Sequence, residues 1–263
     1  MNRQSLWIAA AIIAALVATA CGGGNDAELL VETGVDFAAQ GRLIEAILQY
    51  DEAISADPQY APAYYHRGSA RIALNQYQRA VDDLDEAIRL DSLYALAYYS
   101  RGLAYDRLGD NQRAINDYDE AIRLDPEDPE TYNNRGNVYA SLGLSLQAIE
   151  DYDEAIRLNP NDPTAYYNRA TPYFDLDQPE RAIEDLDAAI RLDPQYALAY
   201  MNRGLVYFDL GQPERAIQEL DDAIKLDPEL APAYVNRGFA YGGLEQHERS
   251  IQDFDQAIRL DPQ

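Results

Sequence analysis

Four asparagine residues stand at a constant spacing of 34 residues: Asn134, Asn168, Asn202 and Asn236. A carboxamide offers both a hydrogen-bond donor and an acceptor, so it can pair with a peptide backbone. Four such groups at an even rise could hold an extended chain without reading its side chains. The alternative is that asparagine only tolerates a solvated helix surface, although helix propensity gives it no reason to recur there. The chemistry that this spacing favours is binding rather than catalysis.

Aromatic residues and a histidine accompany the asparagine series. His66 stands at the same point of the period as the asparagines, and Tyr65, Tyr99 and Tyr167 each stand one place earlier in their periods. Exposed aromatic side chains gathered on one face are typical of binding surfaces. The alternative is that these rings pack against the adjacent unit of the fold. Together with the four asparagines, they are the candidate ligand-binding residues.

The other reactive side chains form no catalytic or metal-binding pattern. The chain has one cysteine and two histidines, His66 and His247, which is too few for a thiolate or imidazole metal site. Its recurrent carboxylates fall on expected helices, without the glycine turn that a calcium-binding loop needs. No nucleophile stands with a base and an orienting group. We therefore expect no enzyme activity, no metal and no cofactor.

The elements that position these residues come from an internal period of 34 residues. Small residues recur in three columns, and a proline closes nearly every unit. The first column is Gly34, Gly68, Gly102, Gly136, Gly204 and Gly238, with Ala170 in the remaining place. The other two columns are alanines that begin at Ala46 and Ala53. Each unit is too small to bury a core alone, so the units must stack on one another.

A 34-residue unit with small residues at positions 8, 20 and 27 and proline at position 32 resembles the tetratricopeptide repeat (TPR). The repeats span 27–60, 61–94, 95–128, 129–162, 163–196, 197–230 and 231–263. The resemblance implies an all-α TPR solenoid, a right-handed superhelix of seven helix-turn-helix repeats whose first helices line a concave groove. The asparagines fall at position 6 and resemble the ladder with which O-linked N-acetylglucosamine transferases hold substrate peptides.

Charge limits the partners that such a groove would take. The chain has 46 acidic and 21 basic residues, a net charge of −25, so it repels nucleic-acid phosphates. Acids also dominate the expected groove, against the single base Arg107: Glu28, Glu32, Asp106, Glu130, Asp175 and Asp209. We expect the partner to be a protein or extended peptide of neutral to basic character, and no nucleic acid.

Charged residues also recur on the packing side of the repeats. Position 7 is arginine in six repeats, and acids at position 23, such as Asp117 and Asp151, are its expected partners, because partly buried arginine is normally paired. Aspartate at position 25, such as Asp85, precedes a base at position 29, such as Arg89, by four residues. This spacing predicts ion pairs along the surface of the second helix.

Pro172 interrupts the first helix of the fifth repeat. It cannot donate a hydrogen bond to the Asn168 carbonyl, and its ring crowds that oxygen. We expect a kink near Asn168 and a wider groove at this repeat.

The N-terminal segment is predicted to be an export signal. Arg3 precedes an uncharged run from Leu6 to Ala20, whose 15 residues are too few to cross the roughly 30 Å core of a bilayer. The residues before Cys21 resemble a bacterial lipobox, although Ala18 stands where that family prefers leucine. We predict a signal peptide over 1–20, then the lipid-anchor Cys21 and a Gly-rich linker over 21–26. The alternatives are ordinary cleavage at the same bond and an uncleaved signal anchor.

These features favour a non-catalytic scaffold or adaptor at the bacterial cell envelope, lipid-anchored to the outer face of a membrane. One alternative is a recruiting subunit for an envelope enzyme or glycosyltransferase. Another is a self-assembling structural protein, in which the apolar end of an uncapped last repeat pairs with a second copy as a homo-oligomer.

Overall fold

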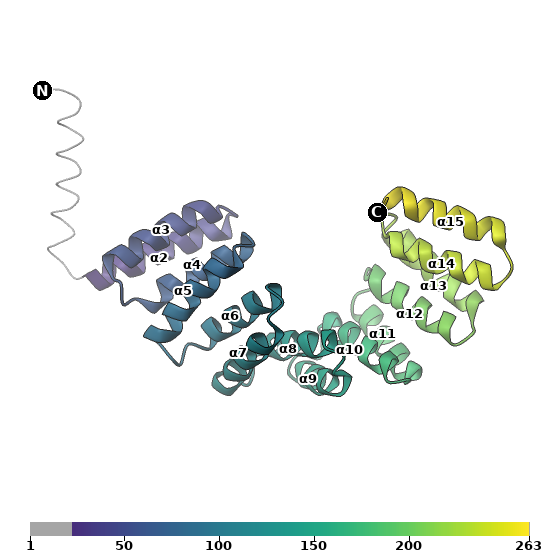
Figure 1. Ribbon diagram of the computed structural model, residues 1–263, viewed down its shortest axis with the longest axis horizontal. Helices are drawn as coiled ribbons and strands as arrows, with labels where there is room; N and C mark the ends of the chain where they lie inside the picture. Colours follow the sequence, from purple (N-terminus) through teal and green to yellow (C-terminus); the bar gives the residue numbers. More distant parts are fainter. Residues whose placement is uncertain (1–22, 263) are drawn as a thin grey trace, which may run out of the picture. The chain divides into compact units, whose positions relative to one another are not determined.

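The computed structural model describes residues 23–262, and every regular element in that range is an α-helix. The helices follow one another as pairs joined by short turns (Figure 1). They divide into two compact units, one ending at Pro126 and the other beginning at Glu127. The expectation of an all-α TPR solenoid is therefore confirmed.

Each pair consists of a first helix and a second helix that pack against each other. The pairs of the first unit are α2 (Gly23–Ala39) with α3 (Leu43–Ala56), α4 (Ala61–Ala73) with α5 (Tyr77–Leu90), and α6 (Ala95–Arg107) with α7 (Asn111–Leu124). The pairs of the second unit are α8 (Pro129–Ser141) with α9 (Ser145–Leu158), α10 (Pro163–Asp175) with α11 (Pro179–Leu192), α12 (Ala197–Asp209) with α13 (Pro213–Leu226), and α14 (Ala231–Gly243) with α15 (His247–Leu260).

The N-terminal helix starts earlier than the sequence indicates. α2 begins at Gly23, so 23–26 form its first turn instead of the second part of the expected linker. Asp26 lies in that turn, where a carboxylate interacts favourably with the helix dipole. Cys21 and the expected signal peptide over 1–20 lie outside the described residues. No helix within 23–262 is both long and apolar enough to cross a bilayer.

The small-residue columns lie where the two helices of a pair meet. A Cβ atom built on Gly136 would lie 2.8 Å from Cε1 of Tyr152, and Tyr152 is only 1% exposed. Ala148 and Ala155, on the facing side of α9, are 0% and 2% exposed. Glycine and alanine therefore set the separation of the helices, as the periodic columns predict.

Arginine at position 7 ties the helices together through charge. Arg101 Nη2 donates to Asp117 Oδ1 at 2.7 Å within its own repeat, which confirms the predicted pairing of positions 7 and 23. Arg101 Nη1 also donates to Asp85 Oδ1 of the preceding repeat at 2.6 Å. The same double bridge recurs at Arg67, Arg169, Arg203 and Arg237. Burial alone would lower the pKa of Arg101, but the two aspartates outweigh it and raise this pKa.

The predicted ion pairs between positions 25 and 29 are wrong. Asp85 is held by Arg101, as described above, and Arg89 pairs with Glu86 at 2.6 Å instead. The arginine from the next repeat reaches Asp85 because stacking places α6 against the middle of the preceding second helix, α5. At five repeats the acid of position 25 thus joins neighbouring repeats rather than stabilises one helix: Asp51, Asp85, Asp153, Asp187 and Asp221.

Helix α10 continues through Pro172, whose side chain is fully buried. The proline therefore does not end the helix. The kink expected near Asn168 stays a prediction.

Candidate functional site

The asparagines of position 6 lie half-buried on the first helices of the second unit, in α8, α10, α12 and α14. Asn168 Nδ2 donates to Asn133 Oδ1 at 3.1 Å, which links α10 to α8. Asn133 stands at position 5, one place before Asn134. At this junction the carboxamide series therefore stabilises the stacking of repeats as well as facing outward.

Asn202 and Tyr167 lie close together between α12 and α10. Burial raises the pKa of the Tyr167 hydroxyl, and the neighbouring Asn202 carboxamide opposes this rise. The Tyr167 ring also packs against Tyr196, with ring centroids 4.9 Å apart. The structure thus brings two of the candidate binding residues together in one cluster.

In the first unit, Tyr65 and His66 form a second cluster on α4. Their ring centroids are 4.9 Å apart, and Tyr65 lies equally close to Tyr94. His66 stacks on Tyr50 at 5.7 Å. Burial lowers the pKa of His66, so this side chain favours its neutral form. Packing against neighbouring rings holds both candidates in fixed orientations.

Tyr99 of α6 lies 6.1 Å from the ring of Tyr118. The Tyr118 hydroxyl is buried and has no hydrogen-bond partner among the described residues. Burial raises the pKa of Asp106, which lies near that hydroxyl and interacts with it electrostatically. At position 12, α6 therefore carries the Asp106 carboxylate, where the corresponding helix α10 carries the Phe174 ring.

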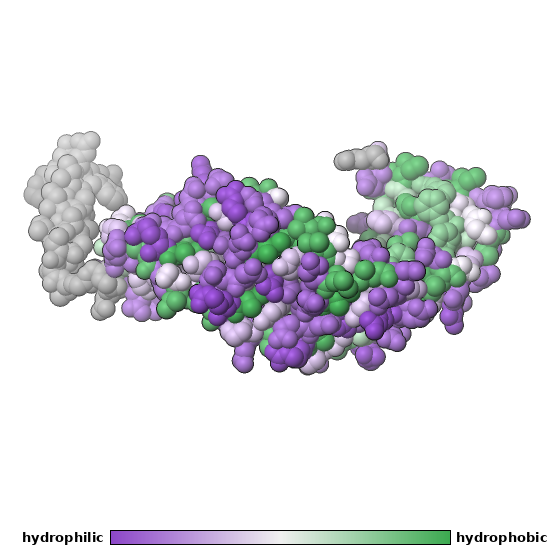
Figure 2. Space-filling model, turned by 60° about the horizontal axis from the view of Figure 1, so that its bottom comes forward, coloured by the Kyte–Doolittle hydropathy of each residue, from purple (hydrophilic) through white to green (hydrophobic). Residues whose placement is uncertain are grey.

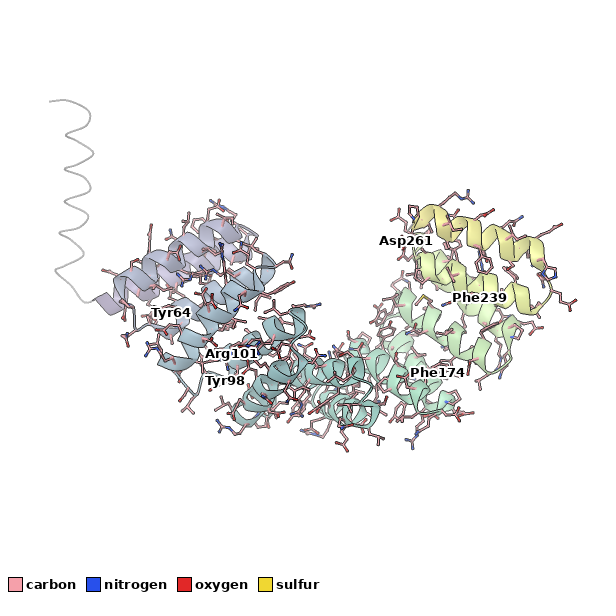
Figure 3. The ribbon with its side chains drawn as sticks, viewed as in Figure 1. Tyr64, Tyr98, Arg101, Phe174, Phe239 and Asp261 are labelled. Carbon is pink, nitrogen blue, oxygen red and sulfur yellow. The ribbon has the colours of Figure 1, made fainter. Side chains whose placement is uncertain are left out.

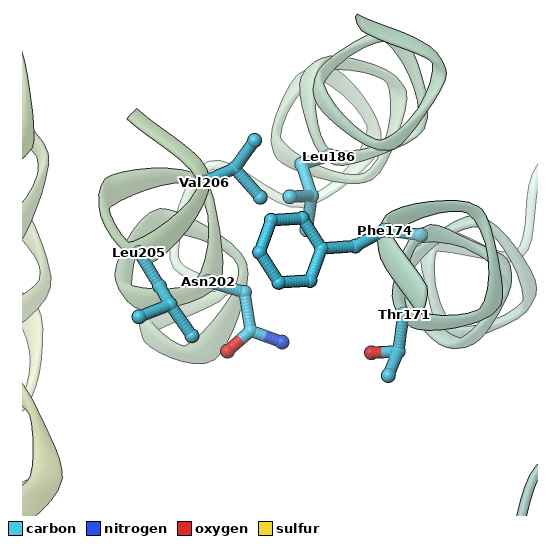
Figure 4. A pocket seen from close by; sticks show the side chains of 7 residues that line it. Thr171, Phe174, Leu186, Asn202, Leu205 and Val206 are labelled. Carbon is cyan, nitrogen blue, oxygen red and sulfur yellow. The ribbon is translucent and has the colours of Figure 1, made fainter. Parts of the chain in front are cut away.

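A small apolar pocket lies between α10 and α12 (Figure 4). Its volume is about 120 Å³, and Ala170, Thr171, Phe174, Leu186, Asn202, Leu205 and Val206 line it. Figure 4 shows the Phe174 ring projecting toward Val206 and Asn202, with Thr171 and Asn202 on the open side. Asn202 is therefore a sequence-predicted residue that combines a carboxamide with an adjoining apolar pocket.

The remaining candidates lie elsewhere on the first helices. Asn134 is half-buried in α8. Asn236 lines a depression of about 370 Å³ with Val235 and Ile258. Phe239, also on α14 and labelled in Figure 3, is 54% exposed. Its ring packs edge-on against that of Phe254.

The face of the molecule drawn in Figure 2 is mainly hydrophilic. Figure 2 shows polar residues over most of the visible face, with apolar side chains in separate patches among them. Asp175 and Asp209 are exposed on α10 and α12, and neither has a salt-bridge partner within residues 23–262. In the same range, no three histidine, cysteine or acidic side chains gather to hold a metal ion.

Sequence reasoning missed several residues of this face. Asn133 stands at position 5, where it departs from the recurring tyrosines. Thr171 and Leu205 stand at position 9, which varies from repeat to repeat and so gives no periodic signal. Leu205 could have been found as an apolar residue on the expected groove face, since position 9 shares that face with position 6.

Family models of the TPR match nearly all of the described chain. The model described as TPR repeat matches residues 34–71, 68–109 and 107–143. Two models described as tetratricopeptide repeat match 167–231, and 129–162 with 231–263. The comparison with curated proteins found no match.

Solved structures show the same architecture. A MamA structure is 30% identical over 64% of this chain and 92% of its own, with a TM-score of 0.56. YrrB, described as a TPR protein with an unusual peptide-binding site, is 27% identical over 70% of this chain and 95% of its own, with a TM-score of 0.59. A tetratricopeptide repeat protein from Parabacteroides merdae shares the fold at 22% identity, with a TM-score of 0.72, over 90% of this chain and 94% of its own.

Repeats of this kind are generally protein-interaction modules rather than catalysts, and the half-buried Asn202 carboxamide beside an apolar pocket fits that role. With family models covering far more than half of its length, the chain belongs to the tetratricopeptide repeat family.

Proposed function

We propose that the chain is a non-catalytic scaffold that binds an extended segment of a partner protein along the first helices of its second unit. The observation that carries this proposal is the pocket between α10 and α12, where the Asn202 carboxamide adjoins an apolar space. A carboxamide can pair with the peptide backbone while the pocket receives a side chain. The similarity to YrrB, with its peptide-binding site, supports the same class of ligand.

The partner segment is expected to be neutral to basic. The chain has a net charge of −25, and Asp175 and Asp209 are exposed on the proposed binding helices. Opposite charge on the partner speeds association and disfavours acidic competitors. Binding should accordingly weaken as salt concentration rises.

Affinity capture from cell-envelope extracts tests the proposal. The wild-type chain is compared with a variant in which Asn134, Asn168, Asn202 and Asn236 are all replaced by alanine. The captured proteins are identified by mass spectrometry, and their dissociation constants are then measured with purified components. The quadruple variant should lose the partners that bind along the first helices.

A matched control replaces four exposed carboxamides on the second helices by alanine. These residues are Asn116, Gln147, Gln218 and Gln252. The control carries the same number of amide deletions on the other side of the repeats, so it should capture the partners as well as wild type does. Equal capture by all three proteins would contradict binding through the first helices.

The proposed place of action is the cell envelope, with a lipid on Cys21 as the anchor. The support is the sequence alone: a short apolar run that ends in small residues before the single cysteine. Mass spectrometry of the membrane fraction should find an N-terminal peptide that begins at a lipid-modified Cys21. A Cys21→Ser variant should leave the membrane fraction, and an unmodified Cys21 or retained Met1 in the wild type would contradict the anchor.

A further inference from the structure

The pocket between α10 and α12 has a counterpart at the same register in the first unit. There, a cavity of about 290 Å³ is lined by residues that include Val35, Ala38, Tyr50 and His66. The first three stand at positions 9, 12 and 24 of one repeat, and His66 stands at position 6 of the next repeat. The residues at the same four positions around the smaller pocket are Thr171, Phe174, Leu186 and Asn202. The recurrence indicates that neighbouring first helices create such a pocket through repeat geometry.

The two pockets differ in the residue at position 12. Phe174 projects into the pocket of the second unit, whereas Ala38 stands in its place in the first unit. Apolar protein cavities of about 150 Å³ bind a benzene ring. A space of about 120 Å³ therefore suits a branched aliphatic side chain, and an aromatic ring needs the additional room that a smaller residue at position 12 gives.

Two features of α10 and α12 make their junction suitable for a side chain from outside. The two helices approach one another less closely than α12 and α14 do. Leu205 is 39% exposed and Thr171 is exposed at the opening, so apolar surface is reachable from solvent. Burying an aliphatic side chain against such walls is favourable by the area that it removes from water.

Charged residues at the rim of the pocket indicate which residues of a bound peptide would flank the inserted side chain. Asp175 and Asp209 follow Thr171 and Leu205 by four residues, so they lie on the same sides of their helices, one turn further on. Both are exposed, and neither has a salt-bridge partner in the described part of the chain. Lysine or arginine next to the inserted side chain would neutralise them.

We propose that the pocket between α10 and α12 holds one leucine-sized aliphatic side chain of an extended peptide that carries lysine or arginine nearby. This proposal rests on the proposed function and specifies its ligand. Phe174 acts as the size-selecting residue, and the Asn202 carboxamide pairs with the peptide backbone at the pocket mouth. The inserted aliphatic side chain fixes where the peptide lies along the solenoid. The basic residues of the peptide make the chain bind it in preference to acidic peptides.

Photo-crosslinking locates the bound side chain. The probe is an eleven-residue peptide of alternating serine and lysine with photo-leucine at its centre, added to the full chain. Crosslinks should fall within residues 170–174 and 202–206. Crosslinks elsewhere on the first helices would overturn the pocket assignment while leaving the proposed function standing. Labelling confined to the second helices, or no labelling at all, would overturn both.

Two substitutions at position 9 give matched variants. Leu205→Asp should lower the crosslinking yield at α10 and α12 on the order of tenfold or more, because it places a charge in the apolar wall. Val35→Asp changes an apolar residue at position 9 in the first unit that has the same 39% exposure as Leu205, and it should leave that yield unchanged. An equal yield in Leu205→Asp and wild type would overturn the proposal.

A size exchange tests the role of Phe174. Competition by peptides with leucine or tryptophan at the centre should favour leucine in wild type and tryptophan in Phe174→Ala. Phe174→Leu keeps part of the side-chain volume, so its preference between the two peptides should be intermediate. This variant provides a result if the alanine variant unfolds. Phe208→Ala, at the same position of the next repeat, should keep the wild-type order. An unchanged order in both Phe174 variants would show that this side chain does not select size.

Charge is tested with the same peptide in which glutamate replaces every lysine. The acidic peptide should fail to compete with the lysine peptide. The double variant Asp175→Asn with Asp209→Asn should reduce the difference between the two peptides. Equal competition by both peptides against wild type would overturn the preference for a basic ligand.

Discussion

Arg101 Nη1 donates to Asp85 Oδ1 at 2.6 Å, although the two residues belong to different repeats. The same guanidinium also holds Asp117, which is only 5% exposed. The Arg101 side chain stacks near Tyr98, with 5.5 Å between its Cζ atom and the ring centroid (Figure 3). One side chain therefore joins three helices of the first unit, α5, α6 and α7.

Arg101→Met should destabilise the first unit strongly. It leaves the buried Asp117 without its partner, and breaking a buried ion pair in this way costs about 3 to 5 kcal/mol in the free energy of unfolding. Urea unfolding followed by circular dichroism measures the loss, and hydrogen exchange of α6 and α7 locates it. Repeat proteins can unfold in parts, so the two measurements are read together.

Two variants separate the partners of Arg101. Asp85→Asn removes the exposed partner, and the free energy of unfolding should fall by less than about 1 kcal/mol. Arg101→Met combined with Asp117→Leu removes the unpaired buried charge and should recover most of the stability. If Asp85→Asn were as damaging as Arg101→Met, the buried carboxylate would not be the dominant contribution.

Alanine in place of glycine should have opposite effects at two positions. In Gly136→Ala the new Cβ would lie 2.8 Å from Tyr152, whose hydroxyl donates to Asn137 Oδ1 at 2.7 Å and so resists displacement. The free energy of unfolding should fall by about 1 to 3 kcal/mol. In Gly242→Ala the nearest atom outside the local backbone is 3.6 Å away, so the gain in helix propensity should raise stability by about 0.5 to 1 kcal/mol. A loss at both positions would contradict the packing argument.

Buried tyrosines should make the fold sensitive to high pH. Burial raises the pKa of Tyr50 to about 12 from an ordinary value of 10, and that of Tyr196 also to about 12. The folded state therefore favours the neutral phenol, and this contribution to stability is fully present below pH 10 and is lost as pH rises through 12. Tyrosinate absorbance and circular dichroism, recorded in parallel, should show late ionisation that accompanies unfolding.

Tyr50→Phe provides the control for the alkaline transition. It removes one buried ionisable group, so the unfolding midpoint should move to higher pH. Ionisation of all tyrosines near pH 10 with the helices intact would be incompatible with the burial of Tyr50.

The carboxamide bond between Asn168 and Asn133 should contribute to stability as well as to the binding face. Alanine at either position should lower the free energy of unfolding by about 1 kcal/mol. The double variant should cost less than the sum, because each single change already removes the shared hydrogen bond. Additive losses would show that the two side chains do not interact. The same double-mutant cycle also measures how much of any binding loss in Asn168→Ala comes from lost stability.

Periodicity made much of the fold predictable, and its limits explain what was missed. Gly136 and Ala148 recur at fixed places, so helix pairing could be read from them. Arg101 with Asp117 was also predicted, because both columns are periodic and partly buried arginine needs a partner. Asp85 was assigned to Arg89 because four-residue spacing within a helix is visible in sequence, whereas contact between repeats depends on how the repeats stack.

The binding face was harder to predict for a physical reason. The asparagines were found because they recur, but Thr171 and Leu205 belong to a position that changes in every repeat. Which of these variable residues form a pocket depends on the separation of α10 and α12 and on the rotamer of Phe174. Neither quantity has a periodic signature in the sequence.

The double bridges of the arginines also limit how this chain can change length during evolution. Each of Arg67, Arg101, Arg169, Arg203 and Arg237 lies 16 residues from both of its acidic partners. A single-residue insertion in a connecting turn would move one partner out of register and leave a charge unmatched. Gain or loss of a whole repeat by recombination preserves every separation. The number of repeats is therefore free to vary among descendants of such a gene, while the length of each repeat is not.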